Sequence, residues 1–146
     1  ADMSGWIVGP ALSLAQLQAT LDRLGVAPGP AAVLLYTTPL PADADPLVVE
    51  AGHQALLPLA SQPGAIVAGV LKLAPAAGST PVVLAGGVPR WGLLVAGDGV
   101  PLARGDVTND TGTGAIRITG GTTAGGETSP TLYPGGLVGL AETFLT

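Results

Sequence analysis

His53 is the only histidine of this 146-residue chain, which also has no cysteine, so a catalytic triad or metal site would depend on this one side chain. A serine nucleophile would need the sharp turn of a G-x-S-x-G motif, and no serine stands in that pattern. His53 follows Glu50 and Gly52 in a segment typical of a turn between two strands. We therefore predict a surface histidine rather than a catalytic or metal-binding one.

Aspartates could instead supply the two carboxyl groups of a glycosidase, which lie about 5 to 10 Å apart. The aspartates in expected loops and turns are Asp43, Asp45, Asp98, Asp106 and Asp110. Aspartate is common in turns because its side chain accepts hydrogen bonds from nearby backbone amides. The segment that begins at Asp106 lacks the ligand spacing of a calcium loop, and no glycine-rich segment has the context of a nucleotide-binding loop. The residues therefore predict no enzyme activity, no metal and no cofactor.

Charged residues are unusually sparse in this sequence. Lys and Arg number 5 and Asp and Glu number 10, so charged residues make up 10% of the chain, against about 25% in ordinary soluble domains. The net charge of -5 and the lack of a basic run argue against nucleic-acid binding. With 47% hydrophobic residues, such a surface predicts that neighbouring subunits cover part of it, in a homo-oligomer or a larger assembly. A codon bias toward Ala, Gly, Pro and Val would give the same composition without a partner.

The sequence does not predict a membrane span. The longest stretch without Asp, Glu, Lys or Arg, from Ala51 to Leu71, contains His53, Pro58 and Pro63. The first residues lack the basic region and apolar core of a secretory signal. We expect no contact with a membrane, and the absence of cysteine suits assembly in a reducing cytoplasm.

One amphipathic helix is expected near the N-terminus, over residues 11–25. Ser13 and Gln16 have the spacing of a capping box, with Ser13 as the N-cap. Gly25 and Pro28 are expected to end the helix. The apolar stripe at helical spacing consists of Leu14, Leu17, Leu21 and Leu24. The preceding residues 1–10 are expected to form an extended arm, and its apolar side chains are Trp6, Ile7 and Val8.

From residue 31 onward, short apolar runs alternate with Gly, Pro and Asp clusters about every ten residues, which is typical of an all-β domain. The predicted strands are Ala32–Thr38, Pro46–Glu50, Ala55–Leu59, Ile66–Leu73, Val82–Leu84, Arg90–Val95, Val100–Arg104, Ala115–Thr119 and Leu137–Phe144. They predict a β-sandwich or jelly-roll-like fold over residues 31–146. The whole chain, 1–146, is then one mainly β domain with an N-terminal amphipathic helix and an extended N-terminal arm.

The clearest local signal is a hairpin whose turn contains Gly97, Asp98 and Gly99, because tight hairpin turns need positive φ angles. Pro101 places the second strand of this hairpin at a sheet edge or at a bulge. Trp91, in the first strand, is predicted to be a core residue. The stretch Gly120–Pro130, rich in Gly, Thr and Ser, is the most loop-like part of the chain.

Three blocks in a fixed order follow the predicted helix. They are an apolar strand that runs into a proline-containing loop, Ala32 to Ala42; the block Gly69 to Ala74; and a tryptophan strand joined through an aspartate-glycine turn to its partner, Arg90 to Val107. This order resembles small virion proteins of tailed bacteriophages, which are encoded among head and tail structural genes. The resemblance runs from Leu14 to the C-terminus in loose motifs. The segment Tyr133–Gly139 departs from it, because polar serine and threonine strands would be expected there.

The resemblance and the sparse charge together predict a non-enzymatic structural protein of the virion, assembled in the host cytoplasm. A capsid decoration or cement protein, which reinforces the shell by contacts between subunits, is the leading hypothesis. Its partners would be the major capsid protein or tail proteins, and further copies of itself. The expected contact residues are Trp6, Ile7 and Val8 of the arm and Thr122, Thr123 and Glu127 of the loop. The alternatives are a tail-associated structural protein and a host-surface module that binds a glycan or receptor, which an exposed tryptophan in a groove would favour.

Overall fold

The structure is a computed structural model that describes residues 7, 9–39, 52–78 and 81–145. Of the predicted contact residues, Trp6 and Val8 lie outside this part of the chain, as does the predicted strand at 46–50. Asp43 and Asp45 also lie outside it.

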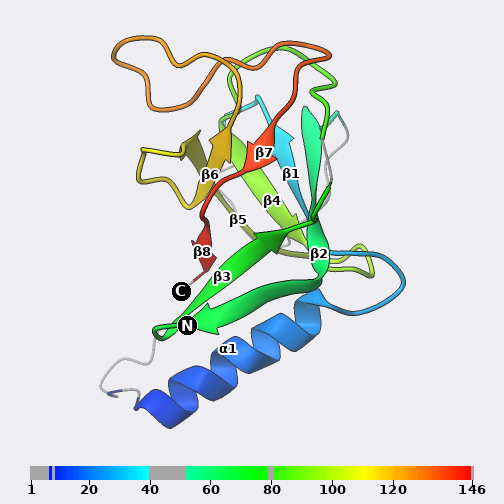
Figure 1. The fold of residues 1–146 in the computed structure, drawn as a ribbon, viewed down its shortest axis with the longest axis vertical. Coiled ribbons are helices and arrows are strands. Elements are labelled where there is room, and N and C mark those ends of the chain that lie inside the picture. The colour runs from blue at the N-terminus through cyan, green and yellow to red at the C-terminus, as the bar shows by residue number, and fades with distance from the viewer. Residues whose placement is uncertain (1–6, 8, 40–51, 79–80, 146) are drawn as a thin grey trace.

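Eight strands form one sheet in the order β7-β6-β5-β4-β1-β2-β3-β8. Their bounds are β1 Ala32–Tyr36, β2 Ala55–Val67, β3 Val70–Pro75, β4 Trp91–Val95, β5 Pro101–Asn109, β6 Ile116–Thr119, β7 Gly139–Leu140 and β8 Phe144–Leu145. Neighbouring strands are antiparallel except for β5 and β6, which run parallel. Figure 1 shows that the sheet curls rather than lying flat.

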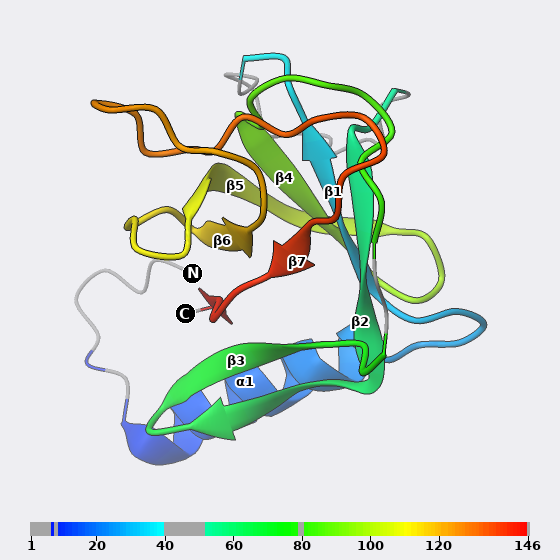
Figure 2. The ribbon, with the colours of Figure 1, turned by 45° about the horizontal axis from the view of Figure 1, so that its top comes forward.

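The C-terminal segment brings the two edges of the curled sheet toward each other. The edge strands β7 and β8 are joined through Ala141, Glu142 and Thr143. The Ala141 amide donates to the carbonyl oxygen of Arg117 next to β7 at 2.8 Å, and the Leu73 amide of β3 donates to the Thr143 carbonyl oxygen at 3.0 Å. One short segment thus holds both ends of the sheet (Figure 2). The prediction of a mainly β protein with one helix is confirmed, but the two packed sheets of a sandwich or jelly roll are not, because the described strands form one continuous sheet.

The core fills the inside of the curl. Its fully buried side chains come from most elements and include Leu24, Val33, Leu35, Leu57, Leu59, Leu71, Ile118 and Leu132. The central strands β1 and β4 are buried along their whole length. Their side chains that point away from this core form a second cluster around Trp91, whose ring stacks on Tyr36 with centroids 4.3 Å apart. The Trp91 Nε1 donates to the Thr38 hydroxyl at 3.1 Å, so the prediction of a core tryptophan is confirmed.

The helix α1, Pro10–Leu24, begins earlier than the sequence predicts. Gly9 is the N-cap and Pro10 occupies the first turn, where a missing N–H costs nothing. Ser13 lies inside the helix and its amide donates to the Gly9 carbonyl at 3.0 Å, so the predicted capping box at Ser13 is wrong. The predicted end is confirmed, because the helix stops at Leu24 and the Gly25 amide donates to the Leu21 carbonyl at 3.2 Å.

The helix packs along the β2–β3 hairpin (Figures 1 and 2). Leu21 and Leu24 of the predicted stripe are buried, and Leu17 is half-buried against the core. Leu14 is 53% exposed, because only the C-terminal half of α1 lies over the core. The stripe therefore positions the helix through its last two turns.

Five predicted strands differ from the structure by more than two residues. Two are longer than the predicted Ala55–Leu59 and Val100–Arg104, because β2 continues to Val67 and β5 to Asn109. The run Ile66–Leu73 is not one strand, because the chain turns at Ala68 and Gly69, whose φ angles are +50° and +82°. The run Val82–Leu84 forms only an isolated bridge, and Leu137–Phe144 is divided between β7 and β8.

The predicted β4–β5 hairpin is confirmed. Its ladder shifts register between Leu94 and Val95, next to Pro101, so the predicted bulge is also confirmed. Gly99 has the positive φ of a tight turn, +88°. Gly97 is needed for a different reason: a Cβ there would collide with the carbonyl oxygens of Val26 and Gly29.

Candidate interaction surface

Asp98 and Asp110 lie in turns as predicted, whereas Asp106 lies within β5 opposite Trp91 of β4, so its prediction as a turn residue is wrong. The Asp98 carboxylate pairs with Arg23 at 3.1 Å and accepts from the Val100 amide at 3.3 Å. The side-chain hydrogen bond from Arg23 lowers the pKa of Asp98 below its ordinary value. The Asp106 carboxylate accepts from the Ala115 amide at 3.0 Å. His53 is half-buried, and no group of three or more His, Asp or Glu side chains that could hold a metal is found among the described residues.

A different feature stands out at the end of the molecule opposite α1. Two segments 45 to 55 residues apart in sequence, 81–87 and 131–138, run antiparallel beside each other, and we call the pair the apolar ribbon. The Val83 amide donates to the Gly136 carbonyl and the Gly135 amide to the Val83 carbonyl, both at 2.9 Å. A second reciprocal pair joins Gly87 and Leu132 at 2.9 and 3.0 Å. The ribbon is therefore held by backbone hydrogen bonds along its length.

Side chains of the ribbon alternate between the core and the outside, as in a strand pair. Those that point inward and are buried are Val83, Leu132 and Val138. Those that point outward are between 47% and 64% exposed, and they are Val82, Leu84, Tyr133 and Leu137. Val82 and Leu137 are direct partners across the ribbon, so their side chains lie side by side on its outer face.

The ribbon carries no charge. None of the residues from 81 to 89 or from 128 to 141 is Asp, Glu, Lys, Arg or His. Exposed apolar side chains on an ordinary monomer are scattered among charges, whereas here four of them share one uncharged face. Burying this face against a partner would remove apolar area from water without desolvating any charged group.

Gln54 fixes the ribbon to the centre of the sheet. Its side chain is 1% exposed, and its Nε2 donates to the Gly87 carbonyl at 2.9 Å. Its backbone amide donates to Leu35 of β1 at 2.6 Å, and its carbonyl accepts from the Leu84 amide at 2.8 Å. Gln54 Oε1 is buried and has no hydrogen-bond partner among the described residues. A single buried glutamine thus links both β1 and the exposed ribbon.

The predicted loop contacts lie next to the ribbon. Thr122 forms a bridge with Thr131, where the second ribbon segment begins, and is exposed. The Thr123 hydroxyl accepts from Asn109 Nδ2 at 3.3 Å and is half-buried. Glu127 is exposed at the tip, where its amide closes a turn on Ala124 at 3.0 Å.

Further hydrogen bonds tie the base of this loop to the sheet. The Ser129 hydroxyl donates to the Pro89 carbonyl at 2.8 Å, and the Asn109 amide donates to the Thr128 carbonyl, also at 2.8 Å. Ile7, the described residue among the predicted arm contacts, stands three residues before the start of α1 at Pro10 and is 98% exposed.

Sequence reasoning did not identify the four outward side chains of the ribbon. The apolar character of Tyr133–Gly139 is visible in the sequence, but its pairing with the segment near Val82 is not. The signal that could have found the ribbon is the joint absence of charge from 81–89 and 128–141.

Comparison with known proteins finds no family model, no curated protein and no solved structure that matches this chain. Within the described part of the chain, α1 is too short to be a membrane-spanning helix, and no other helix is a candidate.

Proposed function

We propose that this protein is a non-enzymatic structural component of a phage particle, and that it acts as a capsid decoration or cement protein. In this proposal, the apolar ribbon is the surface that docks on the shell. The observation that carries the proposal is the uncharged face formed by Val82, Leu84, Tyr133 and Leu137, held in place by the Val83 and Leu132 backbone pairs and by Gln54.

The physical basis is the burial of apolar area on a preformed surface. Each exposed leucine or tyrosine would gain on the order of 25 cal/mol for each Å² removed from water. Little conformational entropy would be lost, because the ribbon backbone is already hydrogen-bonded on both segments. The partner surface must be apolar or neutral, since a buried charge facing this ribbon would find no counter-ion.

The choice of a virion partner rests on the resemblance to small phage structural proteins and on the sparse charge of the whole chain. A tail-associated role would use the same surface on a different neighbour. The host-surface alternative would need an aromatic stacking platform. Trp91 is buried against Tyr36 and is not available for one, which supports the structural role over glycan binding.

The test is the mass of the purified chain by light scattering, alone and with assembled capsid shells of the phage that encodes it. The informative variant is Leu137→Asp, which places a charge on the outer face of the ribbon beside Val82. We expect it to weaken shell binding about tenfold or more, the effect of a charge buried without a partner in an apolar interface.

The matched control is Val100→Asp, at an exposed apolar residue of the β4–β5 turn, which should bind like the wild type. A monomer that ignores the shell would contradict the decoration role. Binding to isolated tails instead would move the protein to the tail, and a hit on a glycan array that Tyr133→Ala removes would support the host-surface module.

A further inference from the structure

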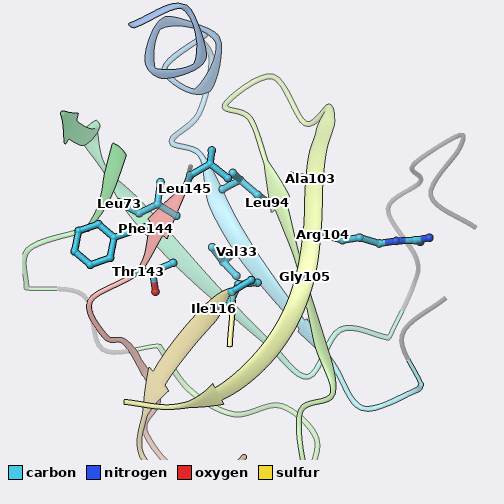
Figure 3. Close-up of a pocket in the computed structure, with 11 residues that line it drawn as sticks. Val33, Leu73, Leu94, Ala103, Arg104, Gly105, Ile116, Thr143, Phe144 and Leu145 are labelled. Carbon is cyan, nitrogen blue, oxygen red and sulfur yellow. The ribbon is translucent and has the colours of Figure 1, made fainter. Parts of the chain in front are cut away.

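A second apolar surface opens on the side of the curl, between β5 and β8. It is a cavity of about 70 Å³ that reaches the surface beside Ala103, Gly105 and Phe144. The aliphatic side chains that line it are Val33, Leu73, Leu94, Ala103, Ile116 and Leu145. We call this cavity the slot. Figure 3 shows these side chains gathered around one space, and they come from six different strands.

The slot exists because neighbouring strands end too early to cover it. β6 pairs with β5 only from Val107 onward, so the half of β5 that contains Ala103 and Gly105 pairs with β4 alone among the described strands. On the other side, β8 pairs with β3 through Phe144 and Leu145. The wall of the curl is therefore incomplete at this one place, and the core is reached from outside through it.

The chemistry of the slot suits one aliphatic side chain. Arg104 and Phe144 point away from the space in Figure 3. The polar side chain that lines it is Thr143, and its hydroxyl already accepts from the Arg117 amide at 3.2 Å and donates to the Ala141 carbonyl at 3.1 Å. A polar or charged ligand group would find no partner there, whereas an aliphatic group would complete the packing.

A shallow groove leads from the slot to α1. Ala103, Leu94 and Leu145 also line a second hollow, whose opposite wall is formed by Ala19 and Arg23. An extended segment that entered the slot would therefore lie between the C-terminal half of α1 and β5.

Ile7 is the aliphatic side chain best suited to the slot. It is 98% exposed, the most exposed large hydrophobic residue of the described chain, and it stands in an uncharged stretch from Ser4 to Ala19. Ala19, which borders the groove beside the slot, lies about 13 Å along α1 from Pro10. The three residues from Ile7 to Pro10 span at most about 10 Å, so a second copy is better placed than the same chain to bring Ile7 to the slot.

We propose that the N-terminal arm is exchanged between copies, and that Ile7 of one copy fills the slot between β5 and β8 of another. The contact would close the incomplete wall of the curl and cover the exposed isoleucine at the same time. This inference goes beyond the proposed function, because it concerns contacts between copies and uses none of the ribbon residues.

The experiment uses disulfide formation between two singly substituted full-length chains, Ile7→Cys and Ala103→Cys. The wild-type chain has no cysteine, so no other thiol can react. The two proteins are mixed under mild oxidation, and the mixed dimer is identified by mass. We expect it to form about tenfold faster than the background collision rate, because binding raises the effective concentration of the two thiols.

The matched control is Ile7→Cys mixed with Val100→Cys, an exposed position on the same hairpin that does not line the slot. A rate equal to this control would overturn the exchange. A doubly substituted chain that forms its disulfide only within itself, with no mixed dimer, would also overturn it, because the arm would then fill its own slot.

A second variant tests whether the slot must be empty for the cross-link to form. A chain that carries Ala115→Cys, another residue that lines the slot, should form the mixed dimer with Ile7→Cys. Adding Ala103→Leu to that chain fills the slot with a larger side chain, so we expect the fold to be kept and the mixed dimer to be lost. Leu137→Asp should leave this cross-link unchanged while it weakens shell binding. The two results together separate failure of the arm exchange from failure of the proposed function.

Discussion

The ribbon and the slot are both apolar and both reach the surface, but they are exposed for opposite reasons. The ribbon projects outward because strand-like pairing sends every second side chain away from the core, as Val82 and Leu137 show. The slot is hollow because pairing stops, with β6 joining β5 only at Val107. Extra pairing thus produces an outward apolar face that can dock on a neighbour. Missing pairing produces a concave one that can receive a single side chain.

The largest loss of stability is expected from Gln54→Ala, which removes the side-chain hydrogen bond between the ribbon and the sheet. The Gly87 carbonyl would keep the Leu132 amide but lose its side-chain donor, and a cavity would remain at the buried Gln54 site, so we expect the free energy of unfolding to fall by about 2 kcal/mol. Chemical denaturation measures the loss. The control is Gln62→Ala, at an exposed glutamine of β2, the strand that begins directly after Gln54, which should change little. Equal losses in the two variants would show that Gln54 does not anchor the ribbon.

Thr143→Val removes the hydroxyl that ties the segment between β7 and β8 to Arg117, beside the slot, while keeping the side-chain volume. The Arg117 amide would lose its hydroxyl acceptor, which predicts a loss of about 1 to 2 kcal/mol and faster hydrogen exchange at Arg117. Thr113→Val, at an exposed threonine, serves as the control. Unchanged exchange at Arg117 would mean that the C-terminal segment is held by its backbone bonds alone.

Ala68→Asn tests the turn of the β2–β3 hairpin, which packs against α1 and lies far from the ribbon. Ala68 has a φ of +50°, a left-handed conformation that is unfavourable for alanine and more favourable for asparagine before glycine. We expect the free energy of unfolding to rise by about 0.5 to 1 kcal/mol. The thermal midpoint measures it, with Ala65→Asn in the regular part of β2 as the control. A lower midpoint for Ala68→Asn than for Ala65→Asn would contradict the argument.

The smallest effect is expected from the Asp98 and Arg23 pair, which joins α1 to the β4–β5 turn. Because Arg23 lowers the pKa of Asp98 in the folded state, the pair adds stability above the ordinary pKa of aspartate. That stability is lost as the pH falls through the lower folded-state pKa. Asp98→Asn should therefore flatten the dependence of stability on pH below about pH 4. High salt should reduce the difference between the two proteins, since the pair is exposed.

Local sequence signals predicted the parts of the fold that depend on local chemistry. The end of α1 at Leu24, the β4–β5 hairpin and its bulge beside Pro101 were all predictable, because glycine permits turn conformations that other residues avoid and proline fixes φ and removes a donor. The burial of Trp91 followed from its size and its place in an apolar strand. The start of α1 was mispredicted because Pro10 at the first helical position is as good a start as a capping serine.

The candidate surfaces depended on contacts between residues far apart in sequence. The sequence by itself determined that the ribbon segments carry no charge, that the arm carries none after Asp2, and that few charges are available elsewhere. Only the tertiary structure decided that Val82 lies beside Leu137, that Gln54 supports Gly87, and that β6 leaves the wall open beside Ala103. The physical reason is that strand pairing is a long-range contact. Its register and its end points are set by the closure of the whole sheet rather than by the residues of either strand.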